Sequence, residues 1–170
     1  KKIRVPSDPT LILAEIAHLK GSNHVNIPEY LDSFMIDNKE IWLVMQFIEG
    51  VDAEDLVKYI KLSPSEIAAV CYAVLSALRY LHGKKIIHRD VKGGNILVET
   101  NGKVFLTDLG LSITEGPCLN TGAGTRAFMA PEVITTRTYK CNADVWSLGM
   151  TLVQLVTRHS PYRNYRACDL

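Results

Sequence analysis

The sequence contains few cysteines, no excess of one charge and no long hydrophobic run, and each shortage excludes a class of protein. Four cysteines stand far apart in 170 residues, without the spacing of a zinc site or a dense disulfide framework, which favours a reducing compartment. Nineteen Lys and Arg against eighteen Asp and Glu leave a formal net charge of +1, which gives no reason to expect nucleic acid. The longest apolar run, residues 67–75, falls far short of the roughly 18 residues of a membrane span. We therefore expect a cytoplasmic protein with no membrane span and no nucleic-acid partner.

The N-terminal third has the pattern of a helix followed by a β-hairpin. Asp8 is a typical N-cap and Pro9 suits the first helical position, so a helix is expected to reach Lys20 and to stop at Gly21. Residues 30–47 contain two runs, 30–36 and 40–47, of β-branched, aromatic and aliphatic side chains around a polar turn. This pattern predicts a hairpin.

The middle of the chain predicts a long amphipathic helix. Ser63, Pro64 and Glu66 form a capping box with proline at the first helical position, and the helix should run to about Gly83. The expected apolar stripe consists of Ile67, Val70, Val74, Ala77, Leu78 and Leu81.

The C-terminal part predicts a second hairpin, an irregular stretch and a buried helix. Residues 95–99 and 103–107 are the hairpin strands, turned by an Asn-Gly pair, and residues 143–158 form the helix. Residues 108–131 lack regular periodicity, and irregular stretches of this length in a compact chain are usually functional. Short hairpins combined with helices indicate an α+β fold with two unequal lobes.

Three short motifs follow one another in the C-terminal half. They read His-Arg-Asp-x-Lys-x-x-Asn at 88–95, Asp-Leu-Gly at 108–110 and Ala-Pro-Glu at 130–132. Their order, spacing and position beside a hairpin resemble the signature set of eukaryotic protein kinases, and a lysine two residues after the aspartate is the serine/threonine pattern. The resemblance covers essentially the whole chain. It implies a partial, protein-kinase-like bilobal α+β fold, with residues 1–47 as the remainder of an N-lobe whose sheet is incomplete and residues 48–170 as a C-lobe lacking its last helices.

The resemblance assigns the catalytic roles to four side chains. Asp90 would orient the substrate hydroxyl and accept its proton, and Lys92 would neutralise charge on the transferring phosphoryl group. Asn95 and Asp108 would bind Mg²⁺, a cation that prefers such oxygen ligands together with substrate phosphates. The expected cofactors are ATP and Mg²⁺.

The resemblance also implies the nucleotide-binding residues. Lys1 would pair with Glu15 and with the ATP phosphates, although Lys2 in that role, or a solvated surface lysine, stays open. The remaining cofactor-binding residues are Met45 as the gatekeeper, Gln46 and Ile48 at the adenine, Asp52 near the ribose, and Leu97.

The PAK-like branch of the sterile group is resembled by five short segments, residues 26–27, 30–33, 42–45, 67–71 and 80–82. In that branch Thr121 would be the activating phosphothreonine, Arg89 would bind its phosphate, and Thr125 would bond the catalytic aspartate and lysine. The implied partners are a protein substrate and, through regions outside this chain, a small GTPase or an upstream kinase.

Two further expectations concern the enzyme and its limits. A pseudokinase-like binding or scaffold module is the alternative to an active kinase, because the glycine-rich loop that would cover ATP is not in the chain. For the same reason we expect the 170 residues alone to be weakly active or inactive. The other histidines (His18, His24, His82 and His159) lack metal-ligand spacing and are interpreted as surface or packing residues.

Overall fold

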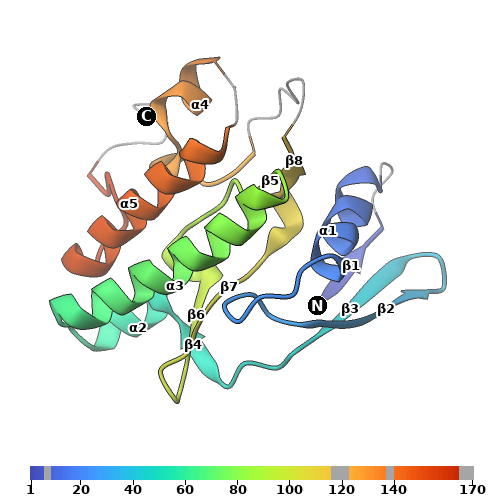
Figure 1. The fold of residues 1–170 in the computed structure, drawn as a ribbon, viewed down its shortest axis with the longest axis horizontal. Helices are drawn as coiled ribbons and strands as arrows, with labels where there is room; N and C mark the ends of the chain where they lie inside the picture. Colours follow the sequence, from blue (N-terminus) through green and yellow to red (C-terminus); the bar gives the residue numbers. More distant parts are fainter. Residues whose placement is uncertain (6–8, 116–122, 137–139, 165–170) are drawn as a thin grey trace.

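The computed structural model describes residues 1–5, 9–115, 123–136 and 140–164 and forms two parts of unequal size (Figure 1). The smaller part is a three-stranded antiparallel sheet in the order β1-β3-β2, with one helix beside it. Its elements are β1 (Lys2–Arg4), α1 (Thr10–Lys20), β2 (Tyr30–Ile36) and β3 (Glu40–Met45). The predicted hairpin is confirmed, and Asp37 and Asn38 turn it with positive φ angles of 48° and 56°, which Asp and Asn tolerate better than most residues.

Two boundaries in this part differ from the prediction. The helix α1 begins at Thr10, with Pro9 as its N-cap rather than its first helical residue, and the expected cap Asp8 lies outside the described residues. The strand β3 ends at Met45 rather than at residue 47, although the Gln46 N–H still donates to the carbonyl of Glu29 (2.8 Å) one residue beyond it. The predicted helix end at Gly21 is confirmed.

The larger part consists of helices and short strands. Its helices are α2 (Ala53–Tyr59), α3 (Pro64–Gly83), α4 (Pro131–Thr136) and α5 (Cys141–Thr157). Its strands are β4 (Gly50–Asp52), β6 (Ile96–Glu99) and β7 (Val104–Leu106) in one sheet, with β5 (Ile86–Ile87) and β8 (Ile113–Thr114) as a separate pair. Three 3-10 turns complete it: η1 (Gly93–Asn95), η2 (Leu109–Leu111) and η3 (Arg126–Phe128).

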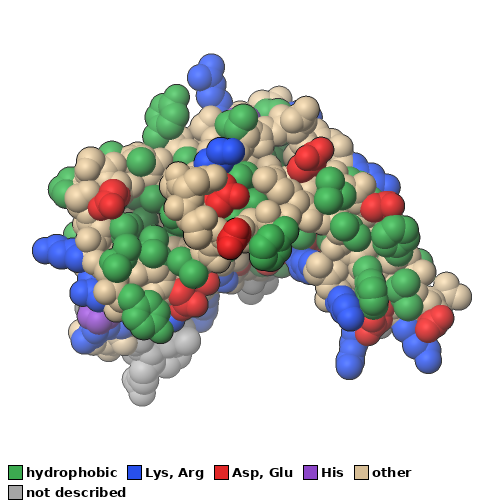
Figure 2. All heavy atoms as spheres, turned by 90° about the horizontal axis from the view of Figure 1, so that it is seen from below, with side chains coloured by type: hydrophobic (Ala, Val, Ile, Leu, Met, Phe, Trp, Pro, Cys, Tyr) green, Lys and Arg blue, Asp and Glu red, His purple; other side chains and the backbone are tan. Residues whose placement is uncertain are grey.

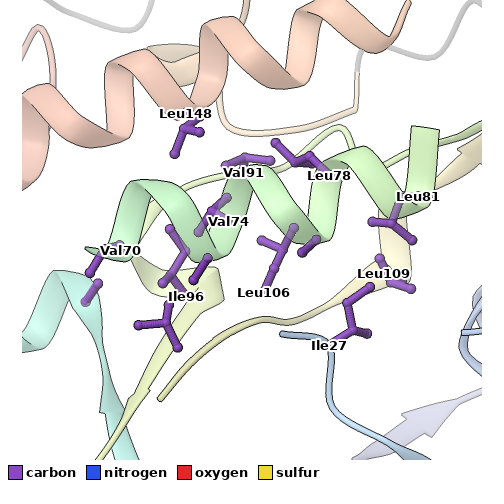
Figure 3. Close-up of a cluster of buried hydrophobic side chains, with 14 of the residues drawn as sticks. Ile27, Val70, Val74, Leu78, Leu81, Val91, Ile96, Leu106, Leu109 and Leu148 are labelled. Carbon is purple, nitrogen blue, oxygen red and sulfur yellow. The ribbon is translucent and has the colours of Figure 1, made fainter. Parts of the chain in front are cut away.

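The helix α3 is the centre of this part. Its capping box is present as predicted, with the Ser63 hydroxyl accepting from the Glu66 N–H and the Glu66 carboxylate accepting from the Ser63 N–H. The predicted stripe is buried apart from Ile67, which is half-buried. Figure 3 shows α3 between Leu148 of α5 on one side and Ile96 and Leu106 of the hairpin on the other. Apolar side chains from three separate stretches of sequence thus form one core, and this core supports the two hairpin ends from which Asn95 and Asp108 extend.

The two parts also meet through the loop that follows α1. The Tyr80 hydroxyl of α3 accepts the Asn23 N–H (2.7 Å) and donates to the Gly21 carbonyl (3.2 Å), and the ring of Tyr80 packs against His24 at 5.1 Å between centroids. The Asn26 amide donates to the carbonyl of Val104 (2.9 Å). The loop of the smaller part is therefore bound to the helix and the hairpin of the larger one.

Figure 2 shows the underside of the molecule as an arch, with a hollow between the helical part and the arm formed by β2 and β3. On that arm several large apolar side chains are exposed, among them Phe34, Trp42 and Val44. Within the described residues, no helix has both the length and the apolar character needed to cross a membrane.

Candidate active site

A lysine and two carboxylates from three separate elements meet at the junction of the two parts. The Lys1 ammonium lies 2.8 Å from Glu15 Oε1 on α1 and 2.7 Å from Asp108 Oδ1, which follows β7. Lys2 instead places its ammonium 4.1 Å from the centroid of the Trp42 ring. Adjacent residues of a strand point to opposite faces, so only one of the two lysines can reach the carboxylates. The structure thus selects Lys1 as the partner of Glu15.

Lys1 and Asp108 hold each other in their charged forms. Burial opposes the charge on the Lys1 ammonium, but hydrogen bonds and the negative charges of Asp108 and Glu15 outweigh burial and raise the pKa of Lys1. Burial likewise opposes the Asp108 carboxylate, but the Lys1 ammonium and the Gly110 N–H lower the pKa of Asp108. The backbone of Asp108 is left-handed (φ 62°, ψ 73°), a conformation that Asp tolerates, and its carboxylate accepts the Gly110 N–H.

A second cluster surrounds Asp90. Its Oδ1 accepts the hydroxyl of Thr125 (2.7 Å) and the Thr125 N–H (2.9 Å), and its Oδ2 lies 2.9 Å from both the Lys92 ammonium and the Asn95 amide nitrogen. The Lys92 ammonium also donates to the Thr125 hydroxyl (2.8 Å), so Thr125 bonds both groups as predicted. Burial opposes the Asp90 charge, but these donors, Lys92 foremost, lower the pKa of Asp90. The carboxylate is therefore ionised and fixed in orientation at neutral pH.

The backbone that carries Asp90 is held from below by a buried carboxylate. Asp144 of α5 is fully buried and accepts the N–H groups of His88 and Arg89, each at 2.9 Å, and the His82 ring nitrogen at 2.7 Å. Arg89 adopts a positive φ of 71°, which few non-glycine residues do without such support. Gln154, nearly three helical turns further along α5, accepts the Gly93 N–H at 3.2 Å. The helix α5 thus fixes both ends of the segment on which Asp90 lies.

A cavity of about 650 Å³ opens beside both clusters, between β3, the segment after it and the β6–β7 hairpin. Its lining includes Lys1, Glu15, Asn95, Leu97 and Asp108, and it also includes Met45, Gln46 and Ile48. Most residues predicted to bind the nucleotide therefore line one cavity. Asp52 does not line it, because its carboxylate caps α2 by accepting the Asp55 N–H at 2.8 Å. The predicted contact of Asp52 with a ribose stays untested.

The oxygen atoms around this cavity fit a magnesium ion. The Asn95 amide nitrogen is bound to Asp90, at its carbonyl (2.7 Å) and its carboxylate (2.9 Å), so the amide oxygen points away from it. Asp108 uses Oδ1 for Lys1 and Gly110, while its Oδ2 has no partner within the described residues. No group of three or more His, Cys, Asp or Glu in the described part of the chain could hold a metal by itself. Two protein oxygens completed by substrate phosphates are the ligand set that suits Mg²⁺.

This constellation agrees with the comparison to known families. The family described as "Protein kinase domain" matches residues 1–169. The chain belongs to the protein kinase domain family. The predicted resemblance and fold are confirmed by this match.

Several curated relatives of the kinase domain are named serine/threonine-protein kinases. The chain is 41% identical over 157 residues to pak-1 of Caenorhabditis elegans, covering 91% of this chain and 27% of the relative. It is 40% identical over 155 residues to pakA of Talaromyces marneffei (89% and 24%) and 39% identical over 160 residues to STE20 of Saccharomyces cerevisiae (91% and 17%). The chain thus spans only 17% to 27% of the length of these relatives.

Some contributors to the kinase site were not predicted from the sequence. The burial of His18 agrees with its interpretation as a surface or packing residue, but its two side-chain hydrogen bonds were not predicted. The bond from the Gly93 N–H to the Gln154 side-chain oxygen was not predicted either, because nothing in a helical pattern shows which polar residue faces a distant backbone N–H. The predicted phosphorylation site Thr121 lies outside the described residues.

Proposed function

We propose that the protein is a serine/threonine protein kinase that transfers the γ-phosphate of ATP to hydroxyl groups of a protein substrate. The observation that carries the proposal is the position of Asp90, whose carboxylate is fixed by Thr125, Lys92 and Asn95 directly beside the cavity lined by Asn95 and Asp108. The names of the relatives support the serine/threonine class.

Phosphoryl transfer passes through a loose transition state, so the protein contributes positioning and charge neutralisation. Asp90 would hydrogen-bond the attacking hydroxyl and direct its oxygen at the γ-phosphorus. As the new P–O bond forms and the bond to the β-phosphate oxygen breaks, the hydroxyl proton passes to the Asp90 carboxylate and ADP leaves. A low pKa makes Asp90 a weak base, which suits a proton transfer that comes late in the reaction.

The remaining side chains would bind the triphosphate. Lys1, held by Glu15, would donate to its phosphates, and Lys92 would offset charge on the group in transfer. Mg²⁺ bound by Asn95 and Asp108 would neutralise charge on the β- and γ-phosphates. Met45, Gln46, Ile48 and Leu97 would contact the adenine.

The experiment is transfer of labelled γ-phosphate by the full-length protein to a mixed protein substrate. Asp90→Asn and Asp108→Asn are expected to lower kcat by at least about a hundredfold, since each removes a charge that the reaction needs. Asp55→Asn is the matched control, because it removes an exposed carboxylate that pairs with Lys58 on α2. Transfer that survives in both active-site variants would refute the proposal.

Further proposals concern the whole protein. We propose a lobe boundary between residues 47 and 48, activation by phosphorylation of Thr121 with Arg89 as the phosphate-binding residue, and a cytoplasmic location. Arg89 Nε donates to the Leu111 carbonyl (2.6 Å), which joins the segment of Asp90 to the chain that leads toward Thr121. A small GTPase or an upstream kinase would act through regions outside this chain. All the catalytic positions are filled, so we do not propose a pseudokinase.

A further inference from the structure

A buried histidine on α1 has no role in the mechanism above. His18 is 8% exposed and lies three residues after Glu15, so the two side chains leave neighbouring positions on one helix. Its Nδ1 lies 2.7 Å from the Ser112 hydroxyl and its Nε2 lies 3.2 Å from the Thr114 hydroxyl. Both partners belong to the segment that follows Asp108, and Ser112 is 2% exposed.

The hydrogen bonds of this group run in one direction. The Ser112 hydroxyl donates its proton to the carbonyl of Leu109 (2.6 Å), so toward His18 it can only accept. His18 must therefore carry a proton on Nδ1, and in the neutral ring Nε2 accepts from Thr114. Burial lowers the pKa of His18, which agrees with the neutral ring that this arrangement requires. The series is Thr114 to His18 to Ser112 to the Leu109 carbonyl.

The series joins α1 to the residue next to Asp108. Leu109 is 1% exposed, and Figure 3 shows it with Leu81 and Ile27 at one end of the core. Across the same segment, Arg89 binds the Leu111 carbonyl and β8 pairs with β5. His18 supplies the bond from the α1 side, and on the same helix Glu15 holds Lys1, which in turn binds Asp108.

We propose that His18 is a positioning residue that couples the placement of α1, and thus the Lys1–Glu15 pair, to the placement of Asp108. The inference rests on the proposed kinase function, because its consequence is the alignment of the groups that would bind the triphosphate. When His18 is neutral and bonded to Ser112, the helix and the segment after Asp108 move as one unit. Without this bond, the placement of Asp108 relative to Glu15 depends more heavily on the Lys1 ammonium that lies between them.

The experiment compares kinase kinetics of full-length variants. His18→Leu places an apolar side chain in the buried position and removes both bonds. Ser112→Ala removes the acceptor, and His18→Asn retains an N–H donor near the position of Nδ1. Ser76→Ala is the matched control, since it removes another serine–histidine hydrogen bond (Ser76 to His24, 3.2 Å), which joins α3 to the loop after α1 and does not involve the segment that follows Asp108. We expect kcat/KM for ATP to fall about tenfold in His18→Leu and Ser112→Ala, since a buried bond of this kind contributes about a factor of ten.

The double variant and the conservative variant separate coupling from general damage. Both single changes break the same bond. The kcat/KM of the double variant His18→Leu/Ser112→Ala should therefore lie within about twofold of that of either single variant. His18→Asn should recover activity to within about threefold of the wild type, and Ser76→Ala should stay within about twofold, because neither loses the bond to Ser112. Effects that multiply in the double variant, or wild-type kinetics in His18→Leu, would overturn the inference. If His18→Leu does not fold, the comparison of His18→Asn with Ser112→Ala decides in the same way.

Two measurements that do not depend on catalysis separate the test of this coupling from the test of the proposed function. In protein labelled with ¹⁵N-histidine, the ring shifts of His18 should report a neutral ring protonated at Nδ1, and amide exchange of residues 109–114 should rise in His18→Leu but not in His18→Asn. If the wild type transfers no phosphate, the proposed function fails and these signals alone decide the coupling. The opposite tautomer, or unchanged exchange in His18→Leu, contradicts it even in an active kinase.

Discussion

Asp144 is the residue whose replacement tests most directly how the catalytic segment is held. Its carboxylate is fully buried and accepts three hydrogen bonds, from the N–H groups of His88 and Arg89 and from the ring of His82. Asp144→Asn preserves the shape of the side chain. It replaces one acceptor oxygen by an NH₂ group, so whichever way the amide turns, at least one backbone N–H faces another donor.

The size of the effect follows from these contacts. A buried donor left without a partner costs about 1–3 kcal/mol, and exchanging bonds to a charged acceptor for bonds to a neutral one costs about 1 kcal/mol more. We therefore expect Asp144→Asn to destabilise the folded domain by about 2–4 kcal/mol, a large part of the roughly 5–15 kcal/mol that stabilises an ordinary domain. At about 2–4 °C per kcal/mol for a chain of this size, the midpoint of thermal unfolding should fall by about 10 °C.

Two measurements check this prediction. Thermal unfolding gives the global loss, and amide hydrogen exchange over residues 84–92 shows whether the damage lies at His88 and Arg89. Asp55→Asn is the control, because it removes an exposed pair with Lys58 and should leave the midpoint of thermal unfolding nearly unchanged. Unchanged exchange at the two amides, together with an unfolding midpoint equal to that of the control, would refute the reasoning.

Three other outcomes are expected. Lys1→Met should abolish phosphate transfer and Lys2→Met should not, because only Lys1 reaches Glu15; phosphate transfer by both variants checks this. Folding lowers the pKa of Asp90 from 3.8, so the Asp90 carboxylate stabilises the folded state above that pH and stops doing so as the pH falls through the folded pKa. Below about pH 4, the free energy of unfolding of Asp90→Asn, measured in urea, should therefore depend less steeply on pH than that of the wild type. Ser63→Ala removes the cap of α3 and should lower the free energy of unfolding in urea by about 1 kcal/mol. Adding Glu66→Ala should lower it little further, because the two residues form one capping box.

The parts of the fold that could be predicted are those with strong local signals. The capping box at Ser63 fixes the start of α3 by satisfying the free N–H groups of its first turn, and the boundary at Gly83 agrees with the structure. The helix α2 was not predicted, although Asp52 caps it and acidic residues occupy its first turn. Its seven residues are too few for a periodic pattern, and the family resemblance places Asp52 near the ribose of the nucleotide instead.

The candidate site could be predicted as a set of residues but not as a geometry. The motifs identified Asp90, Lys92, Asn95 and Asp108; the structure places Asp90 against Lys92 and Asn95, and Asn95 lines the cavity together with Asp108. The choice between Lys1 and Lys2 needed the strand register, because it depends on which face of β1 points to α1. The bonds of His18 and Gln154 join residues more than 60 positions apart, and such contacts depend on tertiary packing that a local pattern does not contain.

The contact of Tyr80 with the loop after α1 constrains how the cavity can open. The hydroxyl binds both Gly21 and Asn23, so this corner of the smaller part stays at a fixed distance from α3. Opening by translation would break both bonds at once, whereas rotation about this corner would preserve them. We therefore expect the β2–β3 hairpin to move relative to α3 by rotation about this corner, with the tip of the hairpin travelling furthest.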